Sequence, residues 1–439
     1  MPRRWRGGAE YREMVVLAVP LLVGQLGQVV LSFADSAMVG NYGVADLAAA
    51  SFCVNLFNLP LIFLMGYSYG LLPALGRAFR DLGGMRSVVA AGVRNMLWVS
   101  GCVMLVMGVP LLFLEAFHQP AALHERIVSY YLLMLVSLPA VGLFNVLKQF
   151  FDVRGKTWIA MTVLVGANGL NILGNWLLIF GKLGFPEWGL FGAGVSTLVA
   201  RILEAGVLGV LYLRWRSLHR TAKPFPTYLG RWELLRNGSG MGMQLGLETA
   251  MFSLSVIFVG WLGYEALAAH HIAVTVQTLG FMTYYGLGGA VSIRVSRAIG
   301  QGQLKRARLT AAVGLRLMWG CAVVIAALMG YFRESIAALF TTEPAVGALA
   351  GTLLLVGIAY QPADALQVCY SNALRGVGDA RGLALIAFVA YFLLGLPLAF
   401  LLSTHFTLGA LGVWLGYPIG LLGAGLAYAW RFYRVLRKG

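Results

Sequence analysis

The sequence predicts an all-α integral membrane protein with twelve transmembrane helices, arranged as two six-helix lobes related by pseudo-two-fold symmetry. Three observations lead to this class. The 439 residues are 59% hydrophobic and only 11% charged, whereas a soluble protein carries about 25% charged residues. Apolar runs long enough to cross a bilayer core recur along the whole chain. Short motifs of the first half also return in the second half at a nearly constant offset.

Lipid offers the backbone no hydrogen-bond partners, so each apolar run must form a helix or a strand of a closed barrel. The runs are too long and too continuously apolar for barrel strands. Pro20 lies in the first run and is expected to kink it, because proline removes a backbone hydrogen bond. The twelve expected helices cover residues 14–40, 44–75, 88–117, 127–151, 157–180, 189–215, 237–262, 266–293, 309–332, 345–372, 382–403 and 408–430.

The internal repeat rests on four short matches that occur in the same order in both halves. GVADLAAA, which begins at Gly43, matches GYEALAAH, which begins at Gly263. Duplicated membrane units are typical of secondary transporters. The other three pairs begin at Gly76 and Ser296, at Val153 and Leu374, and at Gly194 and Gly412.

The longest polar stretch, at residues 216–236, separates six expected helices from six. We interpret 1–215 as an N-terminal lobe, 216–236 as a cytoplasmic linker and 237–439 as a C-terminal lobe. Each lobe has an even number of helices, so both start on the same side of the membrane and the repeat is parallel. The four cysteines lie in apolar runs and form no CxxC pair, so neither a disulfide framework nor a cysteine metal site is indicated.

The distribution of positive charge predicts the orientation of the chain. Arginine and lysine gather before the first helix, in the loops after even-numbered helices and at the C-terminus, and Arg375 is counted among these loop charges. The alternate loops hold only Arg126, Lys182 and Arg333. This asymmetry predicts that both termini are cytoplasmic, in the inner membrane of a bacterium. Topology and contact with lipid headgroups account for the net charge of +16 without a nucleic-acid partner.

Three acidic residues lie deep inside apolar runs: Asp35, Glu248 and Asp364. A charge at this depth costs at least about 2.5 kcal/mol on insertion scales, so an inward-facing functional group is the default expectation. A carboxyl group removed from water can bind and release a proton near neutral pH, and when ionised it offers oxygen ligands to a cation such as Na⁺. Glu248 and Asp364, with the Tyr360 hydroxyl one turn away, are the candidate pocket for the cation.

Other polar residues recur at helical spacing around these carboxyl groups. Such stripes either line a proton or substrate pocket or hold helices together through hydrogen bonds, and both interpretations stay open. Arg201 and Glu204 are expected to form a structural pair of opposite charges three residues apart. The pocket candidates are Gln25 and Gln28 beside Asp35, Gln244 beside Glu248, and Asn171 with Asn175. Gln367 beside Asp364, and Asn168 beside Asn171, belong to the same polar stripes.

Several motifs are similar to the multidrug and toxic compound extrusion (MATE) family, and the acidic positions resemble its NorM-type branch. The motifs are AVPL from Ala18, FADSAMVG from Phe33, GAVSIRV from Gly289 and ALRG from Ala373. One departure is Ser36, where many relatives have threonine. The resemblance covers the whole chain and implies a Na⁺- or H⁺-driven antiporter that exports cationic, lipophilic drugs. It also implies a cation site at Tyr360, Glu248 and Asp364, and a second site at Asp35 with Asn171 and Asn175.

We therefore expect a transporter that works by alternating access. Uptake of the coupling ion by the carboxyl groups favours one arrangement of the lobes, and negative charge with aromatic walls suits an organic cation. The expected partners are small organic cations and membrane lipid. We expect no cofactor besides the coupling ion, and a functional monomer because one chain carries both lobes.

Two other functions were weighed against this one. A flippase for a lipid-linked cell-wall or polysaccharide precursor needs cationic groups for a pyrophosphate, whereas the deep charges here are mostly acidic. An intramembrane enzyme or a receptor is disfavoured because no HExxH, serine–histidine–aspartate or phosphate-loop motif is present.

Overall fold

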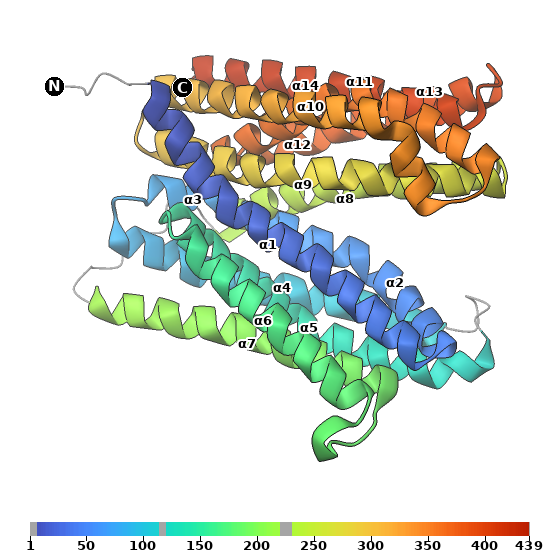
Figure 1. Cartoon of the computed structure of the whole chain (residues 1–439). Coiled ribbons are helices and arrows are strands. Elements are labelled where there is room, and N and C mark those ends of the chain that lie inside the picture. The colour runs from blue at the N-terminus through green and yellow to red at the C-terminus, as the bar shows by residue number, and fades with distance from the viewer. Residues whose placement is uncertain (1–6, 114–119, 220–230, 439) are drawn as a thin grey trace. The chain divides into compact units, whose positions relative to one another are not determined.

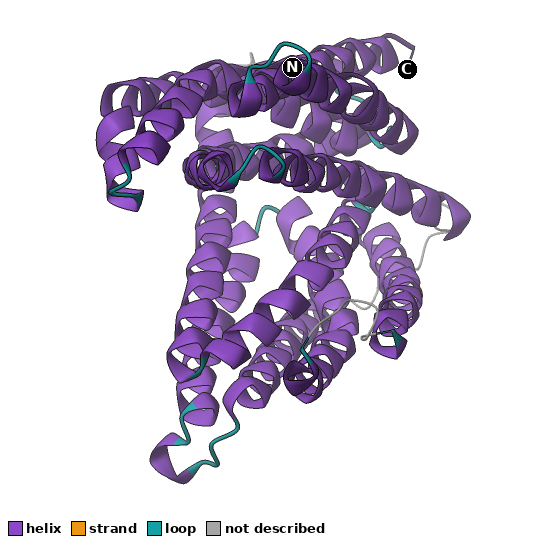
Figure 2. Cartoon of the chain, turned by 90° about the vertical axis from the view of Figure 1, so that its right-hand side faces the viewer, coloured by secondary structure: helices purple, strands orange, loops and turns teal. Residues whose placement is uncertain are grey.

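The computed structural model describes residues 7–113, 120–219 and 231–438, and all regular secondary structure within these ranges is helical (Figure 2). The all-α class is therefore confirmed. Residues 220–230 of the expected linker, including Pro224 and Pro226, lie outside the described residues, as do Arg3, Arg4 and Arg6.

Within the described ranges, eleven helices are long and apolar enough to cross a membrane. The twelfth expected span is α9 (Tyr264–Gly300), a helix of 37 residues that does not meet this measure of apolarity. Gln277, Tyr284, Tyr285 and several glycines interrupt its apolar residues. Its polar content matters for the site described below, because part of it faces the neighbouring helices.

The chain folds into two compact units. The first unit is Val23–Gly242, and the second unit combines Met1–Leu22 with Met243–Gly439. The helix α1 (Gly7–Tyr42) is therefore shared, because it leaves the second unit at Leu22 and enters the first at Val23. This division differs from the lobes expected from the repeat chiefly in that first helix.

In the first unit, α5 (Ala121–Val153) lies at the centre and packs against α2 (Val44–Tyr69), α4 (Leu82–Leu112) and α7 (Gly189–Leu218). Gly192 allows α7 to approach α6 (Thr157–Ile179), since a Cβ atom there would lie 2.5 Å from the carbonyl oxygen of Leu178. The Asp81 side chain caps α4 by accepting a 3.0 Å hydrogen bond from the backbone of Gly83. Two short elements complete the unit, α3 (Leu72–Arg77) and the 3₁₀ turn η2 (Lys182–Gly184).

In the second unit, α11 (Pro344–Val377) is the central helix and packs against α9, α10 (Leu304–Phe340) and α14 (Gly409–Lys438) (Figure 1). Nearly every residue from Tyr360 to Gly376 is buried. Gly378, in the left-handed conformation with φ 93°, ends this helix. The unit also contains α8 (Arg231–Gly260) from Met243 onward, because residues 231–242 of this helix belong to the first unit. A composite segment of α12 (Ala380–Ala387), the π-helical η3 (Phe388–Gly395) and α13 (Leu396–Thr404) completes it.

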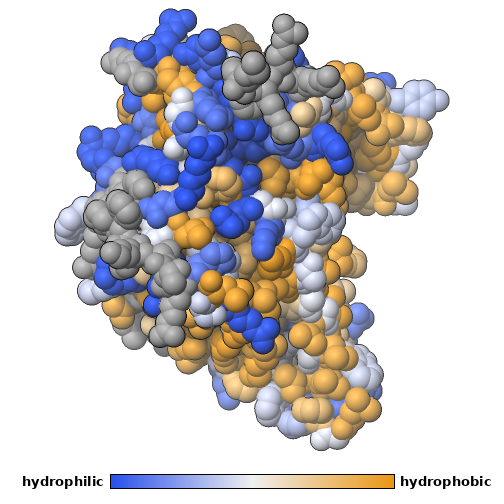
Figure 3. Space-filling view, turned by 90° about the vertical axis from the view of Figure 1, so that its left-hand side faces the viewer, coloured by the Kyte–Doolittle hydropathy of each residue, from blue (hydrophilic) through white to orange (hydrophobic). Residues whose placement is uncertain are grey.

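Surface polarity follows the pattern expected of membrane helices. Hydrophilic side chains gather at the helix ends near the termini, whereas hydrophobic side chains cover the helix flanks (Figure 3). Large apolar residues such as Leu105, Val106 and Val323 are more than two-thirds exposed on those flanks. A soluble protein would bury them, so they indicate contact with lipid.

Candidate functional site

The candidate site of the second unit begins on the buried face of α11. Tyr360, Asp364 and Gln367 recur at spacings of four and three residues, which place them on one side of the helix. All three are buried, with exposures of 6%, 1% and 1%. The structure therefore confirms that an acidic residue lies inside the protein at this position rather than toward lipid.

Glu248 on α8 lies in a hydrogen-bonded network with this face of α11. Its Oε2 atom accepts a hydrogen bond from Gln244 Nε2 at 2.8 Å and another from Gln367 Nε2 at 3.3 Å. Gln367 Nε2 also donates to the Tyr391 hydroxyl on η3 at 2.8 Å. Side chains of α8, α11 and η3 thus meet in one network around this carboxyl group.

Arg375 belongs to the same network, which corrects its assignment to a cytoplasmic loop. It lies in the last turn of α11 and is 2% exposed. Its Nη2 and Nε atoms donate to Gln244 Oε1 at 2.6 and 3.2 Å. The apolar run appeared to end just before this residue, but the helix continues to Val377. The spacing could have indicated this position. Arg375 follows Asp364 by eleven residues, which is close to three helical turns and places both residues on the same face of the helix.

Asp364 has a different environment from Glu248. Its Oδ2 atom is buried and has no hydrogen-bond partner among the described residues, and Gln367 Oε1 is in the same situation. The charges of Asp364 and Glu248 act on one another, and both act on Tyr360. A buried acceptor without a donor is unfavourable, and a proton or a small cation would satisfy it. The residues present therefore fit a cation site.

A second polar chain connects α9 to α11 near Asp364. The Tyr284 hydroxyl donates to Gln361 Oε1, and Gln361 Nε2 donates to Gln277 Oε1 at 2.5 Å. These side chains are at most 5% exposed. Tyr284 lies within electrostatic range of Asp364. These three residues were not among the candidates from the sequence, because uncharged amides and phenols in an apolar run give only a weak signal.

In the first unit, Asp35 on α1 meets the asparagine stripe of α6. Asn175 Nδ2 donates to Asp35 Oδ1 at 2.6 Å and to Asn171 Oδ1 at 3.2 Å. In the amide orientation that satisfies both of its atoms, Asn171 instead donates to Asp35 Oδ1 at 3.0 Å and accepts from the backbone N–H of Thr197 at 3.1 Å. Asp35, Asn171 and Asn175 therefore lie together, and their role in transport stays a prediction.

The remaining candidates are not gathered in the same way. Gln28 is exposed and Gln25 is half-buried, and the structure shows no hydrogen bond from either side chain to the described residues around Asp35. Arg201 does not form the expected ion pair with Glu204 within 4 Å, because its guanidinium turns toward α5 and donates to Ser137 Oγ at 2.6 Å. Within the described residues, no three of the His, Cys, Asp and Glu side chains cluster closely enough to hold a metal ion.

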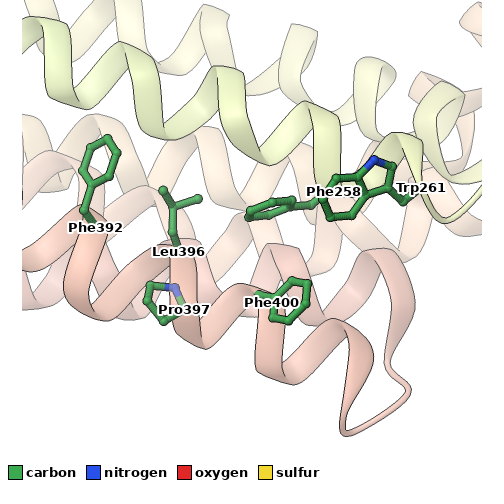
Figure 4. A pocket seen from close by; sticks show the side chains of 6 residues that line it. All are labelled: Phe258, Trp261, Phe392, Leu396, Pro397 and Phe400. Carbon is green, nitrogen blue, oxygen red and sulfur yellow. The ribbon is translucent and has the colours of Figure 1, made fainter.

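An aromatic crevice of about 410 Å³ lies in the second unit between the end of α8 and the segment η3–α13 (Figure 4). Phe258 on α8 and Trp261 just after this helix line it on one side, and Phe392 and Phe400 face them from the other segment. Leu396 and Pro397 complete the wall. The lining has no charged group, so it suits an apolar or aromatic group. The sequence did not single out these aromatics among 24 phenylalanines and 11 tryptophans.

The chain is similar to known membrane transport proteins in both sequence and fold. The family model described as MatE matches residues 20–177 and 241–401, so the two stretches that it matches begin 221 residues apart. Multidrug resistance protein PmpM of Pseudomonas aeruginosa is 31% identical, over 100% of this chain and 94% of that protein. Multidrug resistance protein NorM of Vibrio cholerae is 32% identical, over 97% of this chain and 95% of that protein. The fold is similar to that of a multidrug resistance MATE transporter in an outward-facing conformation, with a TM-score of 0.84, 19% identity, and coverage of 98% and 97%.

Proposed function

We propose that this chain, which belongs to the MatE family of membrane transporters, exports cationic, lipophilic compounds in exchange for Na⁺ or H⁺. The relatives that match over the whole length are named as multidrug resistance proteins, which supports the class of substrate. The observation that carries the coupling to a cation is Asp364, a carboxyl group 1% exposed whose Oδ2 atom has no hydrogen-bond partner in the described part of the chain.

Coupling follows from the cost of a buried charge. An ionised carboxylate inside a membrane protein is unfavourable unless a partner neutralises it. Uptake of a proton or of Na⁺ by Asp364 removes most of that cost, so the loaded and the empty protein favour different conformations. An ion shifts a conformational equilibrium only by its difference in affinity for the two states, and a buried carboxyl group supplies such a difference. The relative solved facing outward supports alternating access for this fold.

The same carboxyl groups give the site its preference for organic cations. Substrate and coupling ion compete for negative charge, so loading of one favours release of the other. Aromatic walls such as those of the crevice on α8 and α13 bind the apolar body of a lipophilic cation and attract its charge through their π faces. Asp35, with its asparagine partners, is the corresponding candidate in the first unit.

The orientation of the chain belongs to this proposal. Basic residues before the first helix and in alternate loops support cytoplasmic termini in a bacterial inner membrane. One chain carries both repeats matched by the family model, which supports a functional monomer. The relatives give no support to the flippase alternative.

The direct test replaces Asp364 by asparagine, which keeps the shape and removes the ionisable group. Asp364→Asn is expected to reduce ion-driven efflux of ethidium from proteoliposomes at least about tenfold, the effect of a loss of roughly 1.4 kcal/mol in coupling. Na⁺ and pH gradients are imposed separately, so the experiment also identifies the ion.

The matched control is Glu334→Gln, which removes an acidic group that is 85% exposed and should leave efflux unchanged. Detergent-solubilised Asp364→Asn should elute as a single folded species. Full efflux by that variant under either gradient would contradict the coupling role of Asp364.

A further inference from the structure

We infer that Arg375 is a built-in counter-charge for Glu248, so that the site in the second unit presents one negative charge and selects monovalent over divalent cations. This inference rests on the proposed function and adds a specificity-determining residue to it. In this arrangement Asp364 is the group that meets the cation, and Glu248 is a fixed part of the scaffold.

The direction of the hydrogen bonds supports this division of roles. A guanidinium group can only donate, and Arg375 donates twice to Gln244 Oε1. The amide of Gln244 is therefore oriented with its oxygen toward Arg375 and its nitrogen toward Glu248. Its Nε2 atom donates to Glu248 Oε2 at 2.8 Å. Glu248 is thus held as an acceptor, and the positive charge of Arg375 is relayed to it through one polarised amide.

Gln367 strengthens the same arrangement. Its Nε2 atom gives Glu248 Oε2 a second donor at 3.3 Å, whereas Asp364 Oδ2 has none. Hydrogen bonds to the charged form of a carboxyl group stabilise that form. The two acids on α8 and α11 are therefore not equivalent, since one is already compensated and the other is left open.

The charge of the site follows from these three residues. Arg375 is the cationic side chain whose charge acts on Glu248, and Glu248 is the charged group that acts on Asp364. With both carboxyl groups ionised, Glu248, Asp364 and Arg375 together carry a charge of minus one. A single monovalent cation balances this charge, whereas a dication overcompensates it. Without Arg375 the balance would require two positive charges.

The test compares the binding of a monocation and a dication by purified protein at equilibrium. Tetraphenylphosphonium serves as the monocation and methyl viologen as the dication, and affinities are measured by equilibrium dialysis. Arg375→Gln should shift the ratio of affinities about tenfold or more toward the dication, because it removes a full positive charge that acts on Glu248. Arg375→Lys keeps the charge and should retain the wild-type ratio.

A charge-compensated pair of variants makes the test independent of the folding of Arg375→Gln. Glu248→Gln alone leaves a neutral site and should weaken tetraphenylphosphonium binding at least about tenfold. The double variant Glu248→Gln with Arg375→Gln restores a charge of minus one on Asp364, leaves neither Glu248 nor Arg375 without its counter-charge, and should regain most of that affinity. Arg316→Gln, an exposed arginine on α10, is the control for the loss of an arginine.

The possible results distinguish failure of this inference from failure of the proposed function. If the double variant binds tetraphenylphosphonium as weakly as Glu248→Gln, then Glu248 itself contacts the cation and the inference is overturned. An unchanged affinity ratio in folded Arg375→Gln also overturns it, while leaving cation export intact. If wild-type protein binds neither probe, the proposed function fails together with the inference.

Discussion

Asp35 and Asp364 are both acidic residues inside membrane helices, but their hydrogen bonds differ. Asp35 accepts a 2.6 Å hydrogen bond from Asn175, whereas Asp364 Oδ2 has no donor within the ranges that the structure describes. A donor favours the ionised carboxylate, and the absence of one favours uptake of a proton or a cation. The amide partners therefore matter as much as the acids themselves.

Replacement of Asn175 tests whether Asp35 needs its amide partner for transport. Asn175→Leu deprives ionised Asp35 of a hydrogen bond to a charged group, which costs about 1.5–3 kcal/mol. We expect ion-driven efflux to fall about tenfold or more in proteoliposomes. Asn168→Leu is the matched control on the same helix, because the buried Asn168 Nδ2 atom has no hydrogen-bond partner among the described residues. Equal efflux by wild type and Asn175→Leu would show that this hydrogen bond is not used.

The sequence predicted the acids of the site better than their partners. Glu248 and Asp364 were conspicuous because charge is rare in apolar runs. Arg375 was missed because it follows the apolar run and resembles a topology charge, although the helix carries it into the protein. Gln277, Gln361 and Tyr284 were missed because uncharged polar residues are common in membrane helices, and only packing decides which of them meet.

At the scale of the element, an ion cluster fixes the start of α1 to the rest of the second unit. Arg294 on α9 pairs with Glu10 and also with Glu13, at 2.6 Å to the latter. Arg306 on α10 pairs with Glu10 at 3.1 Å. Arg294 and Glu10 are at most 5% exposed at their side chains. Buried ion pairs of this kind cost much when one partner is removed, because the other charge is left uncompensated.

Arg294→Ala should therefore destabilise the protein by about 3–5 kcal/mol. The expected result is a clear fall in the midpoint of thermal unfolding in detergent. Arg333→Ala is the control, since Arg333 pairs at 3.4 Å with Glu334 in an exposed position and such pairs contribute about 0–1 kcal/mol. If both variants unfolded at the wild-type temperature, the cluster would have no stabilising role.

Helices α13 and α14 approach closely at Gly412. A Cβ atom on Gly412 would lie 2.5 Å from the backbone carbon of Leu402 and the backbone nitrogen of Ser403. Gly412→Val should therefore force the two helices apart, at a cost of about 1–3 kcal/mol for overpacking. Gly423→Val on the same helix meets no atom within 4 Å and should not change the unfolding midpoint. A stable Gly412→Val variant would mean that α13 can move without loss.

At the scale of the whole molecule, the repeat preserves the fold but not the buried charges. The central helices α5 and α11 correspond, and the family model matches each half once. At an offset of 220, however, Glu248 corresponds to Gln28 and Asp35 corresponds to Ser255. The two halves therefore place their acids on different positions of equivalent helices. We therefore expect replacement of the acidic residue in the first half to affect transport differently from replacement of the acidic residues in the second half.

The charge asymmetry makes a prediction about topology for the whole chain. In a cysteine-free background, Glu343→Cys between α10 and α11 should react with a membrane-impermeant maleimide added outside intact cells. Lys305→Cys in the first turn of α10 should react only after the cells are opened, because this end of the helix belongs to the basic set. Both positions are exposed, so accessibility from each side decides the result. The reverse pattern would place the termini outside.

The sequence by itself determined the helical class, the spans and the repeat, because lipid forces every apolar run of spanning length into a helix and duplication leaves a trace in the order of motifs. It also located the acids, because charge at that depth is expensive. Tertiary structure alone decided that Arg375 compensates Glu248 while Asp364 stays open, and that α1 belongs to both units. These are consequences of which side chains meet across helices, and helical periodicity specifies a face of each helix but not the residue that packs against it.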